Sequence, residues 1–411
     1  MPRWLDGDAG QPAPPTSRQA GRNTRWRSFD AFDVMSMPDK WEYPWFASWD
    51  LAFHCVALAH VDPSFAKNQL LLICREWFQH PDGALPAYEW DFGDANPPVH
   101  AWAALEVFAI DGGRDFDFLS RVFDKLLVNF TWWVNREDAD GSNLFEGGFL
   151  GLDNIGPLDR SHLPVAGQLQ QADATGWMAG YALAMATTAG ILQRAGRRPG
   201  RRRLLVGAVE VDRVTRMFGR LFDPDEFLSP YGLRSVSAYH RDRPYQLDVE
   251  GVHAVVDYEP AESSTGMFGG NSNWRGPVWF PLNFLTAGAL DRYHGFFGDE
   301  LRVEYPVGSG RRLTLAEVAA DLRARLVSIF LAGPDGRRPC FGWVDRLQHD
   351  PRWRDNLMFF EYFHGDNAAG LGAAHQTGWT GLVADVIRRR HGAVTTIDDV
   401  LQNLDRPDPA G

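Results

Sequence analysis

The sequence predicts an all-α fold of the α/α-barrel or toroid type, and two observations lead to this prediction. Segments that are apolar nearly all round alternate with segments whose apolar residues follow one helical face, as in architectures that bury alternate helices. Strand patterns are weak, and residues 252–258 are the best candidate for a small hairpin. Long loops rich in glycine and aromatic residues join the helices, and a functional site in such a fold is expected in these loops.

The predicted helices follow one another from about residue 49. The segment 49–59 is apolar nearly all round, which indicates an inner, buried helix. Asp62 and Pro63 start the next helix, at about 63–79, because aspartate caps a first turn and proline fits the first helical position. Further helices are predicted at about 98–110, 115–135, 174–194, 209–222, 277–296, 314–332 and 370–390. The connecting loops are residues 80–97, 137–173, 223–276 and 336–369.

Charge and cysteine content argue against several classes of protein. The 411 residues include 41 Lys+Arg and 53 Asp+Glu, and this net charge of −12 argues against a nucleic acid as the main partner, because neutralising phosphates needs clustered basic residues. The basic run 194–203 is therefore interpreted as a solvated linker rather than a site for nucleic acid or anionic lipid. Cys55, Cys74 and Cys340 are odd in number and far apart, so a disulfide framework is not expected, and two of them lie in apolar helical runs that favour a buried, reduced thiol.

The sequence also carries expectations about location and chain organisation. No segment reaches the roughly 18 to 20 apolar residues that cross a bilayer, and the N-terminus lacks the apolar stretch of a signal peptide. The expectation is a soluble, cytoplasmic protein with no membrane partner. Residues 1–30 are expected to be irregular, residues 31–392 to form the helical domain, and residues 393–411 to form a C-terminal tail.

Aromatic residues make up 13% of the chain, and many of them lie beside Gly, Asp, Asn and Arg. This mixture suits a pocket for a polar, ring-shaped ligand, because aromatic rings stack on sugar faces while carboxylates and amides bind hydroxyl groups. The alternative is that the aromatic residues fill a helical core. No nucleotide-binding Gly-x-Gly-x-x-Gly or Walker-type motif and no His-Glu-x-x-His or Cys-x-x-Cys motif is present, and the twelve histidines are scattered, so a metal site is not expected.

Three acidic residues lie in settings that suit catalysis. Asp153 lies among glycines and apolar residues, where desolvation is expected to raise the pKa of a carboxyl group. Glu361 lies in an aromatic run just before a predicted helix, and Asp50 heads the buried helix 49–59. The alternative for each is a helix cap or a structural ion pair. Hydrolysis of a glycosidic bond needs two carboxyl groups that differ in protonation, so acidic residues in three such settings favour a glycosidase.

Six segments give a more specific resemblance. They are Trp45-Phe46-Ala47-Ser48-Trp49-Asp50, Asn96-Pro97-Pro98-Val99-His100-Ala101, Gly148-Phe149-Leu150-Gly151-Leu152-Asp153-Asn154, Asn273-Trp274-Arg275-Gly276-Pro277-Val278-Trp279, Phe360-Glu361-Tyr362 and His375-Gln376-Thr377-Gly378-Trp379-Thr380. In order and spacing the chain resembles glycoside hydrolase family 63 from about residue 30 to 390, and within it the bacterial branch related to mannosylglycerate and glucosylglycerate hydrolases.

The resemblance implies an (α/α)6 barrel and an inverting α-glycosidase that acts on a small carbohydrate or glycoside without a metal or organic cofactor. It places the general acid on Asp153 and the general base on Glu361, with room for a water molecule between them, roughly 6.5 to 9.5 Å. It implies that the sugar pocket is lined by Trp49, Asp50, Asn96, Trp274, Arg275, Trp279 and Gln376. Two roles stay open for the arginine, which either orients a carboxylate or fixes its loop.

The chain departs from the family pattern in its middle. Members of this branch carry additional helices between the segments 174–194 and 209–222, where this chain has only the basic run, and nine predicted helices fall short of the twelve in a complete barrel. A missing piece near residues 194–208 is therefore predicted, with the barrel open or distorted there. This leaves an alternative function, a degenerate, non-catalytic relative that binds a sugar without turning it over.

Overall fold

The computed structural model divides into two compact units. Unit 1 comprises the described residues of Met1–Gly151, Gln170–Leu205 and Val394–Gly411, and unit 2 comprises those of Leu152–Leu169 and Val206–Ala393. The structure describes residues 33–39, 46–88, 92, 94–135, 144–145, 155–159, 163–164, 166, 172–196, 211–265, 272–374 and 378–405. Each unit is described by itself.

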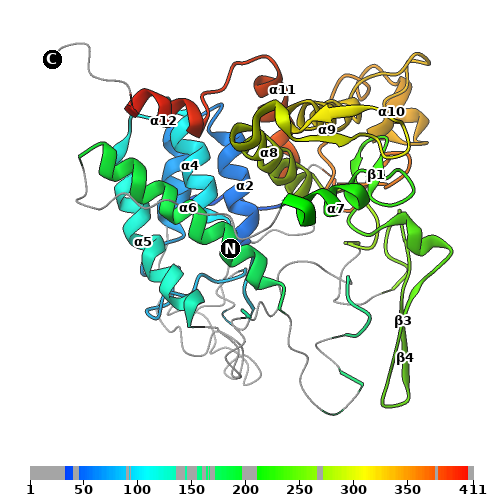
Figure 1. Ribbon diagram of the computed structural model, residues 1–411, viewed down its shortest axis with the longest axis horizontal. Coiled ribbons are helices and arrows are strands. Elements are labelled where there is room, and N and C mark those ends of the chain that lie inside the picture. Colours follow the sequence, from blue (N-terminus) through cyan, green and yellow to red (C-terminus); the bar gives the residue numbers. More distant parts are fainter. Residues whose placement is uncertain are drawn as a thin grey trace, which may run out of the picture. The chain divides into compact units, whose positions relative to one another are not determined.

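Unit 1 is helical. Its described helices are α2 (Ser48–Leu58), α3 (Pro63–Leu72), α4 (His100–Ile110), α5 (Phe116–Val134), α6 (Ala174–Arg194) and α12 (Ile397–Asp405). Helix α4 is central, because it packs against all five of the others (Figure 1). Nine of its eleven residues are buried, and its alanines let neighbouring helices approach closely. The all-round apolar pattern of such a segment thus reflects contact on every side.

Local capping explains where two of these helices begin. The Asp62 carboxylate accepts a hydrogen bond from the Phe65 N–H at 2.9 Å, with Pro63 at the first helical position, as the sequence predicts. The Asp115 carboxylate caps α5 in the same way by accepting from the Phe118 N–H at 3.0 Å. Each cap satisfies a backbone donor that the helix itself leaves without a partner.

Unit 2 combines helices with short hairpins. Its helices are α7 (Val211–Leu221), α8 (Phe280–Phe297), α9 (Leu315–Ser328), α10 (Asp345–His349) and α11 (Val383–Arg390), with 3-10 turns at Ala238–Arg241, Gly298–Glu300, Pro339–Phe341 and Trp379–Leu382. Its strands are β1 (Leu228–Ser229), β2 (Gly232–Leu233), β3 (Tyr245–Val249), β4 (Val252–Val256), β5 (Arg302–Glu304), β6 (Arg312–Thr314), β7 (Tyr362–Phe363) and β8 (Gly370–Leu371). Helices α8 and α9 lie side by side, and α11 packs on α9 (Figure 1).

The strands of unit 2 form four separate antiparallel pairs, β1–β2, β3–β4, β5–β6 and β7–β8. The longest pair, β3–β4, extends away from the helices of its unit (Figure 1) and confirms the hairpin expected near 252–258. A buried apolar cluster lies between α7, α8, α9 and strand β5, and includes Phe218, Leu290 and Leu322. The unit therefore has its own core.

Most predicted helices are present, but two expectations are wrong. Helix α3 ends at Leu72 rather than near residue 79, and the chain continues in turns. Over the described residues 370–374, the helix predicted at 370–390 is instead strand β8 followed by bends and a turn, so Glu361 precedes a strand and not a helix. The cause is the hairpin β7–β8, in which Gly370 pairs with Phe363 and Leu371 pairs with Tyr362. Helices α10 and α12 were not predicted, and α12 lies within 393–411.

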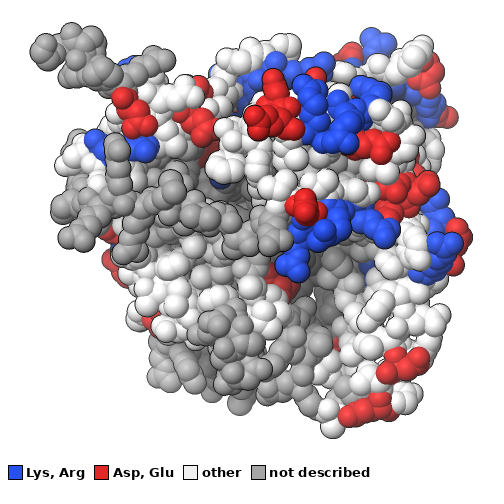
Figure 2. Space-filling model, viewed as in Figure 1, with Lys and Arg blue, Asp and Glu red and all other residues white. Residues whose placement is uncertain are grey.

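The cysteines, the helix lengths and the surface charges of the described residues can be compared with the sequence. Cys55, Cys74 and Cys340 are buried and free, as expected, and burial raises the pKa of the Cys74 and Cys340 thiols to about 12. No helix in the described part of the chain is both long and apolar enough to span a membrane. Basic and acidic side chains are interspersed on the face seen in Figure 2. One ion pair of unit 2 joins Arg323 and Asp291.

Candidate active site

The carboxylate of Glu361 is the best-defined feature of the predicted site. Glu361 directly precedes β7, and only 4% of the residue is exposed. Its Oε1 accepts a hydrogen bond from the Ser272 hydroxyl at 2.6 Å, and its Oε2 accepts one from the Ala373 N–H at 3.0 Å. Acceptance on both oxygens suits an ionised carboxylate, which is the form that a general base needs.

The backbone around this carboxylate is fixed as well. The Glu361 N–H donates to the Ala373 carbonyl at 2.9 Å, and the Glu361 carbonyl accepts from the Trp379 indole N–H at 2.9 Å. Gly372 has a φ of +66°, and a Cβ at this position would lie 2.5 Å from Glu361 Oε2. A glycine is required there because the conformation is left-handed and the carboxylate occupies the space of a side chain.

A second segment, residues 272–279, runs beside β7. Val278 and Phe363 exchange backbone hydrogen bonds at 2.8 and 3.0 Å, which aligns the two stretches in antiparallel register. The Asn273 side chain donates to the carbonyls of Glu259 and Ala261, both at 2.7 Å, and accepts from the Arg275 N–H at 2.8 Å. This asparagine therefore links the segment 272–279 to residues 259–261 and also fixes the turn of the backbone at Arg275.

Two of the predicted pocket residues form a buried aromatic stack within this segment. The rings of Trp274 and Trp279 lie 3.8 Å apart at an angle of 5°, and Tyr362 covers the Trp279 ring at 4.5 Å and 22°. The Trp279 indole N–H donates to the Asn273 carbonyl at 2.9 Å. Because its faces contact Trp274 and Tyr362, Trp279 supports Trp274 rather than offering a free face to a ligand.

The contacts of Arg275 agree with the role of fixing its loop, one of the two roles left open by the sequence, and that role stays a prediction. Its guanidinium, 3% exposed, pairs with the Glu259 carboxylate at 3.3 Å and donates to the Gly156 carbonyl at 2.8 Å. Burial acts to raise the pKa of Glu259, but hydrogen bonds from Ser264 and the charge of Arg275 outweigh it, so the pKa lies below its ordinary value. Glu259 is therefore a structural partner in its ionised form.

A further polar network supports the same region and was missed from the sequence. The Tyr258 hydroxyl donates to Asp366 at 2.8 Å and accepts from Arg234 at 3.0 Å. The Tyr258 ring lies against Gly276, where a Cβ would come within 2.7 Å of it. Burial raises the pKa of Tyr258 to about 12, which keeps its hydroxyl protonated as a donor. Only the fold brings these partners together, because Tyr258 and Asp366 are 108 positions apart.

The other described pocket residues, Trp49, Asp50 and Asn96, belong to unit 1. Trp49 and Asp50 lie in the first turn of α2, with 3% and 5% of their surfaces exposed. The Asn96 side-chain oxygen accepts from the Trp49 N–H at 3.3 Å. Asn96 thus satisfies one of the donors that the start of α2 leaves open, and the loop before α4 is tied to α2.

Two predicted residues, Asp153 and Gln376, lie outside the described residues. The roles of all nine predicted site residues therefore stay predictions. Within unit 2 the structure brings Glu361, Trp274 and Trp279 together around Tyr362 and Ser272, and it places Arg275 on the Gly156 carbonyl.

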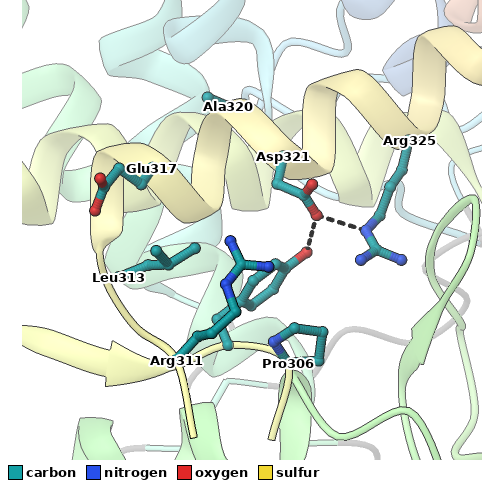
Figure 3. A pocket seen from close by; sticks show the side chains of 8 residues that line it. Pro306, Arg311, Leu313, Glu317, Ala320, Asp321 and Arg325 are labelled. Carbon is teal, nitrogen blue, oxygen red and sulfur yellow. Dashed lines mark hydrogen bonds and ion pairs between the residues drawn. The ribbon is translucent and has the colours of Figure 1, made fainter. Parts of the chain in front are cut away.

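A separate hollow of about 430 Å³ lies on α9 and is lined by none of the predicted residues (Figure 3). Its two carboxylates already have partners. Asp321 accepts from the Tyr305 hydroxyl and from Arg325, both at 2.6 Å, and Glu317 forms a capping box with Thr314 at the start of α9. Both carboxylates thus have contacts within or beside α9, and neither is a residue that the sequence predicts for the site.

Comparison with solved structures gives weak likenesses. An uncharacterized conserved protein from Thermus thermophilus has a TM-score of 0.49 at 17% identity, covering 85% of this chain and 94% of that one. The GH63 mannosylglycerate hydrolase of the same organism, in complex with glucose, has a TM-score of 0.48 at 17% identity, covering 86% of this chain and 96% of that one. TM-scores below 0.5 do not establish a shared fold.

A curated relative gives a stronger match. The uncharacterized protein YMR196W of Saccharomyces cerevisiae is 42% identical over 505 residues, which cover 93% of this chain and 46% of that protein. The chain thus spans about half the length of this relative. Because 93% of this chain is about 380 residues, the alignment holds about 120 positions at which this chain has no residue.

A family model covers the first part of the chain. Residues 43–154 match the mannosylglycerate hydrolase MGH1-like glycoside hydrolase domain. The matched range contains Trp49, Asp50, Asn96 and Asp153, whereas Glu361 lies beyond it. The match confirms, over residues 43–154, the resemblance to mannosylglycerate hydrolase-like glycoside hydrolases that the sequence motifs predict.

Proposed function

We propose that this chain is an inverting glycoside hydrolase of an α-glucoside or α-mannoside, with Asp153 as general acid and Glu361 as general base. The scaffold proposed for residues 31–392 is an (α/α)6 barrel. The family match over 43–154 supports the glycosidase class and includes the proposed acid. The proposed base lies outside that match, so its support comes from the geometry of unit 2.

One observation carries the proposal. The segment that begins at Ser272 contacts the proposed base directly, through the hydrogen bond to Glu361, and three residues later Arg275 holds the Gly156 carbonyl. Gly156 is three residues from Asp153, and three residues span at most about 11 Å. One short segment therefore connects the proposed base to Gly156, a chain neighbour of the proposed acid. The separation of the two carboxyl groups stays a prediction, roughly 6.5 to 9.5 Å for an inverting enzyme.

The proposed reaction uses both carboxyl groups in one step. The protonated Asp153 gives its proton to the glycosidic oxygen as the bond from that oxygen to the anomeric carbon breaks. Ionised Glu361 takes a proton from a water molecule as that water attacks the anomeric carbon from the opposite face. The products are an alcohol and a sugar of inverted anomeric configuration, and the two carboxyl groups exchange protonation states.

The substrate proposed is a small glycoside. The matched family is named for a hydrolase of mannosylglycerate, which supports testing glycosides of small carboxylic acids as well as neutral ones. Trp274, Asp50, Asn96 and Gln376 are proposed to bind the sugar, with Trp49 and Trp279 supporting them. The cytoplasmic location expected from the sequence stays a prediction.

The test is product release by the purified protein. The panel contains nitrophenyl α-glucoside and α-mannoside, glucosylglycerate and mannosylglycerate. Glu361→Gln is expected to lower kcat by about 100-fold to 10,000-fold, because general base catalysis contributes about that much. Glu300→Gln, which changes an exposed glutamate of the same unit, is the control and is expected to retain activity. Wild-type turnover by Glu361→Gln would exclude Glu361 as the base.

Stereochemistry and binding separate the remaining possibilities. Proton NMR of the first product formed from an α-glycoside is expected to show the β anomer, and an α anomer would contradict inversion. Asp153→Asn is expected to cost most with substrates whose leaving groups are poor. Sugar binding without any product would instead favour the non-catalytic alternative, which the roughly 120 alignment positions absent from this chain make a specific rival.

A further inference from the structure

Ser272 is the residue through which one segment of unit 2 contacts the Glu361 carboxylate. Its hydroxyl donates to Oε1 at 2.6 Å, while the Ala373 N–H donates to Oε2 at 3.0 Å. Ser272 is 5% exposed and Glu361 is 4% exposed, so bulk water does not readily replace the serine. This hydrogen bond joins residues 89 positions apart, and Ser272 itself lies just before the motif that begins at Asn273.

The serine is held in place by the residues that follow it. Asn273, the next residue, donates to two carbonyl groups and accepts the indole N–H of Trp279 on its own carbonyl. Backbone hydrogen bonds between Val278 and Phe363 fix this segment beside β7. The Ser272 hydroxyl therefore approaches the carboxylate from a rigid segment, which is the arrangement that keeps a reacting group in one orientation.

We propose that Ser272 is a positioning residue of the general base, which orients the Glu361 carboxylate and stabilises its ionised form. This inference rests on the proposed function. A hydrogen bond to the charged form of a carboxyl group favours that form, and its loss makes protonation easier. Without the Ser272 hydroxyl, Glu361 takes up a proton at higher pH and its unprotonated fraction at mildly acidic pH falls.

The experiment compares four proteins: wild type, Ser272→Ala, Ser272→Thr and Ser237→Ala. Ser237 is the matched control because it is also 5% exposed in unit 2, but its hydroxyl accepts from the Tyr239 N–H and does not contact Glu361. Full pH profiles of kcat/KM are measured on the glycoside that the wild type cleaves best. Thermal unfolding of each variant shows whether the fold is retained.

The expected result is specific to the serine hydroxyl. Ser272→Ala moves the acidic limb of the profile upward by about one pH unit and lowers kcat about 10-fold to 100-fold, with a smaller change in KM. Ser272→Thr restores the limb because it keeps the hydroxyl, and Ser237→Ala leaves it unchanged. A Ser272→Ala profile that superimposes on the wild type, or an equal shift in Ser237→Ala, overturns the proposal.

A second measurement does not depend on turnover. In protein labelled with ¹³C at the glutamate carboxyl, Glu361→Gln identifies the Glu361 signal by its loss, and titration then gives its pKa directly. Ser272→Ala is expected to raise that pKa, and an unchanged value overturns the proposal even in a protein that cleaves no glycoside. Absence of product from every wild-type reaction, with the pKa shift present, contradicts the proposed function and leaves the positioning role of Ser272 intact.

Discussion

Gly372 shows how closely the backbone of unit 2 fits around the Glu361 carboxylate. Its φ of +66° is a conformation that L-residues rarely adopt, and an added Cβ would lie 2.5 Å from Glu361 Oε2 and 2.6 Å from the Tyr362 ring. An added side chain at Gly372 would therefore strain the backbone and would also displace the Glu361 carboxylate. Only displacement of the carboxylate is expected to affect catalysis.

Gly372→Ala is expected to lower both stability and activity. Strain alone costs about 1 to 3 kcal/mol, and displacement of the base is expected to lower kcat at least about tenfold. Gly392→Ala separates the two effects, because Gly392 has a φ of +65° and nothing within 4 Å of an added Cβ. Equal losses of kcat in the two variants would show that the contact with Glu361 has no role.

The Glu259–Arg275 pair predicts a pH dependence of stability. The pKa of Glu259 in the folded protein lies below the ordinary value of 4.5, so its ionised form stabilises the fold above that pH and the contribution is lost as the pH falls through the folded pKa. Glu259→Gln is expected to lower the free energy of unfolding by about 2 kcal/mol at pH 7. The difference from wild type is expected to shrink below about pH 4.5.

Urea unfolding at a series of pH values between 3 and 7 measures this difference. Glu262→Gln is the control, because Glu262 is exposed and only three residues away. A difference between wild type and Glu259→Gln that is constant over the whole range would show that the charge of Glu259 has no part in the effect.

At the scale of single residues, the sequence predicts the chemical groups of the site better than their contacts. Glu361 and Arg275 are singled out by their local settings and motifs, and the structure confirms that Glu361 is buried beside aromatic rings. Ser272 and Glu259 were not predicted. Their importance depends on contacts with Glu361 and Arg275 that form only when distant segments pair, and no local pattern marks a serine as the donor to a carboxylate 89 positions away.

Among the elements, three long apolar helices match their predicted bounds best, although none of them has a side-chain cap. Helix α6 has the predicted bounds, and α2 and α4 differ by one or two residues. The region 370–390 fails because Gly370 and Gly372 belong to a hairpin whose fit depends on Phe360 and Glu361. Helical patterns are local, whereas this hairpin is set by tertiary contacts, which override propensity.

The cap of α3 allows a test at the element scale. Asp62→Ala removes the acceptor for the Phe65 N–H and is expected to lower the free energy of unfolding by about 1 kcal/mol. Asp62→Asn keeps an acceptor oxygen and is expected to lose much less. Chemical unfolding followed by far-ultraviolet circular dichroism measures both, and equal losses would contradict a capping role.

For the whole molecule, the sequence predicts the family and the helical class, while closure of a barrel stays a prediction. The predicted gap, at 194–208, lies mostly outside the described residues. The missing piece therefore stays a prediction: the alignment with the yeast relative holds about 120 positions without a residue of this chain, at places that the match does not specify. On the C-terminal side of the predicted gap, Val211 and Met217 are 41% and 62% exposed. Apolar side chains left without neighbours favour self-association.

Met217→Lys is therefore expected to weaken self-association of the chain. Covering one such side chain contributes about 1 to 2 kcal/mol, so the dissociation constant is expected to rise about tenfold in analytical ultracentrifugation. Val61→Lys is the control, because Val61 is 84% exposed but lies between α2 and α3, away from the gap. A wild-type chain that stays monomeric at every concentration would show that the exposed apolar side chains near the gap do not cause self-association.

The stacked indoles of Trp274 and Trp279 have an optical consequence. Two buried indoles held in one fixed orientation, with ring centroids 3.8 Å apart, lie in an asymmetric surrounding and therefore contribute to the circular dichroism of the protein in the near ultraviolet. A substitution that removes only a proton donor or acceptor leaves that signal in place, whereas one that displaces the segment carrying Ser272 reduces it. The near-ultraviolet signal of this tryptophan pair can therefore show whether an inactive variant has lost only a catalytic group or also the structure of the segment that carries Ser272.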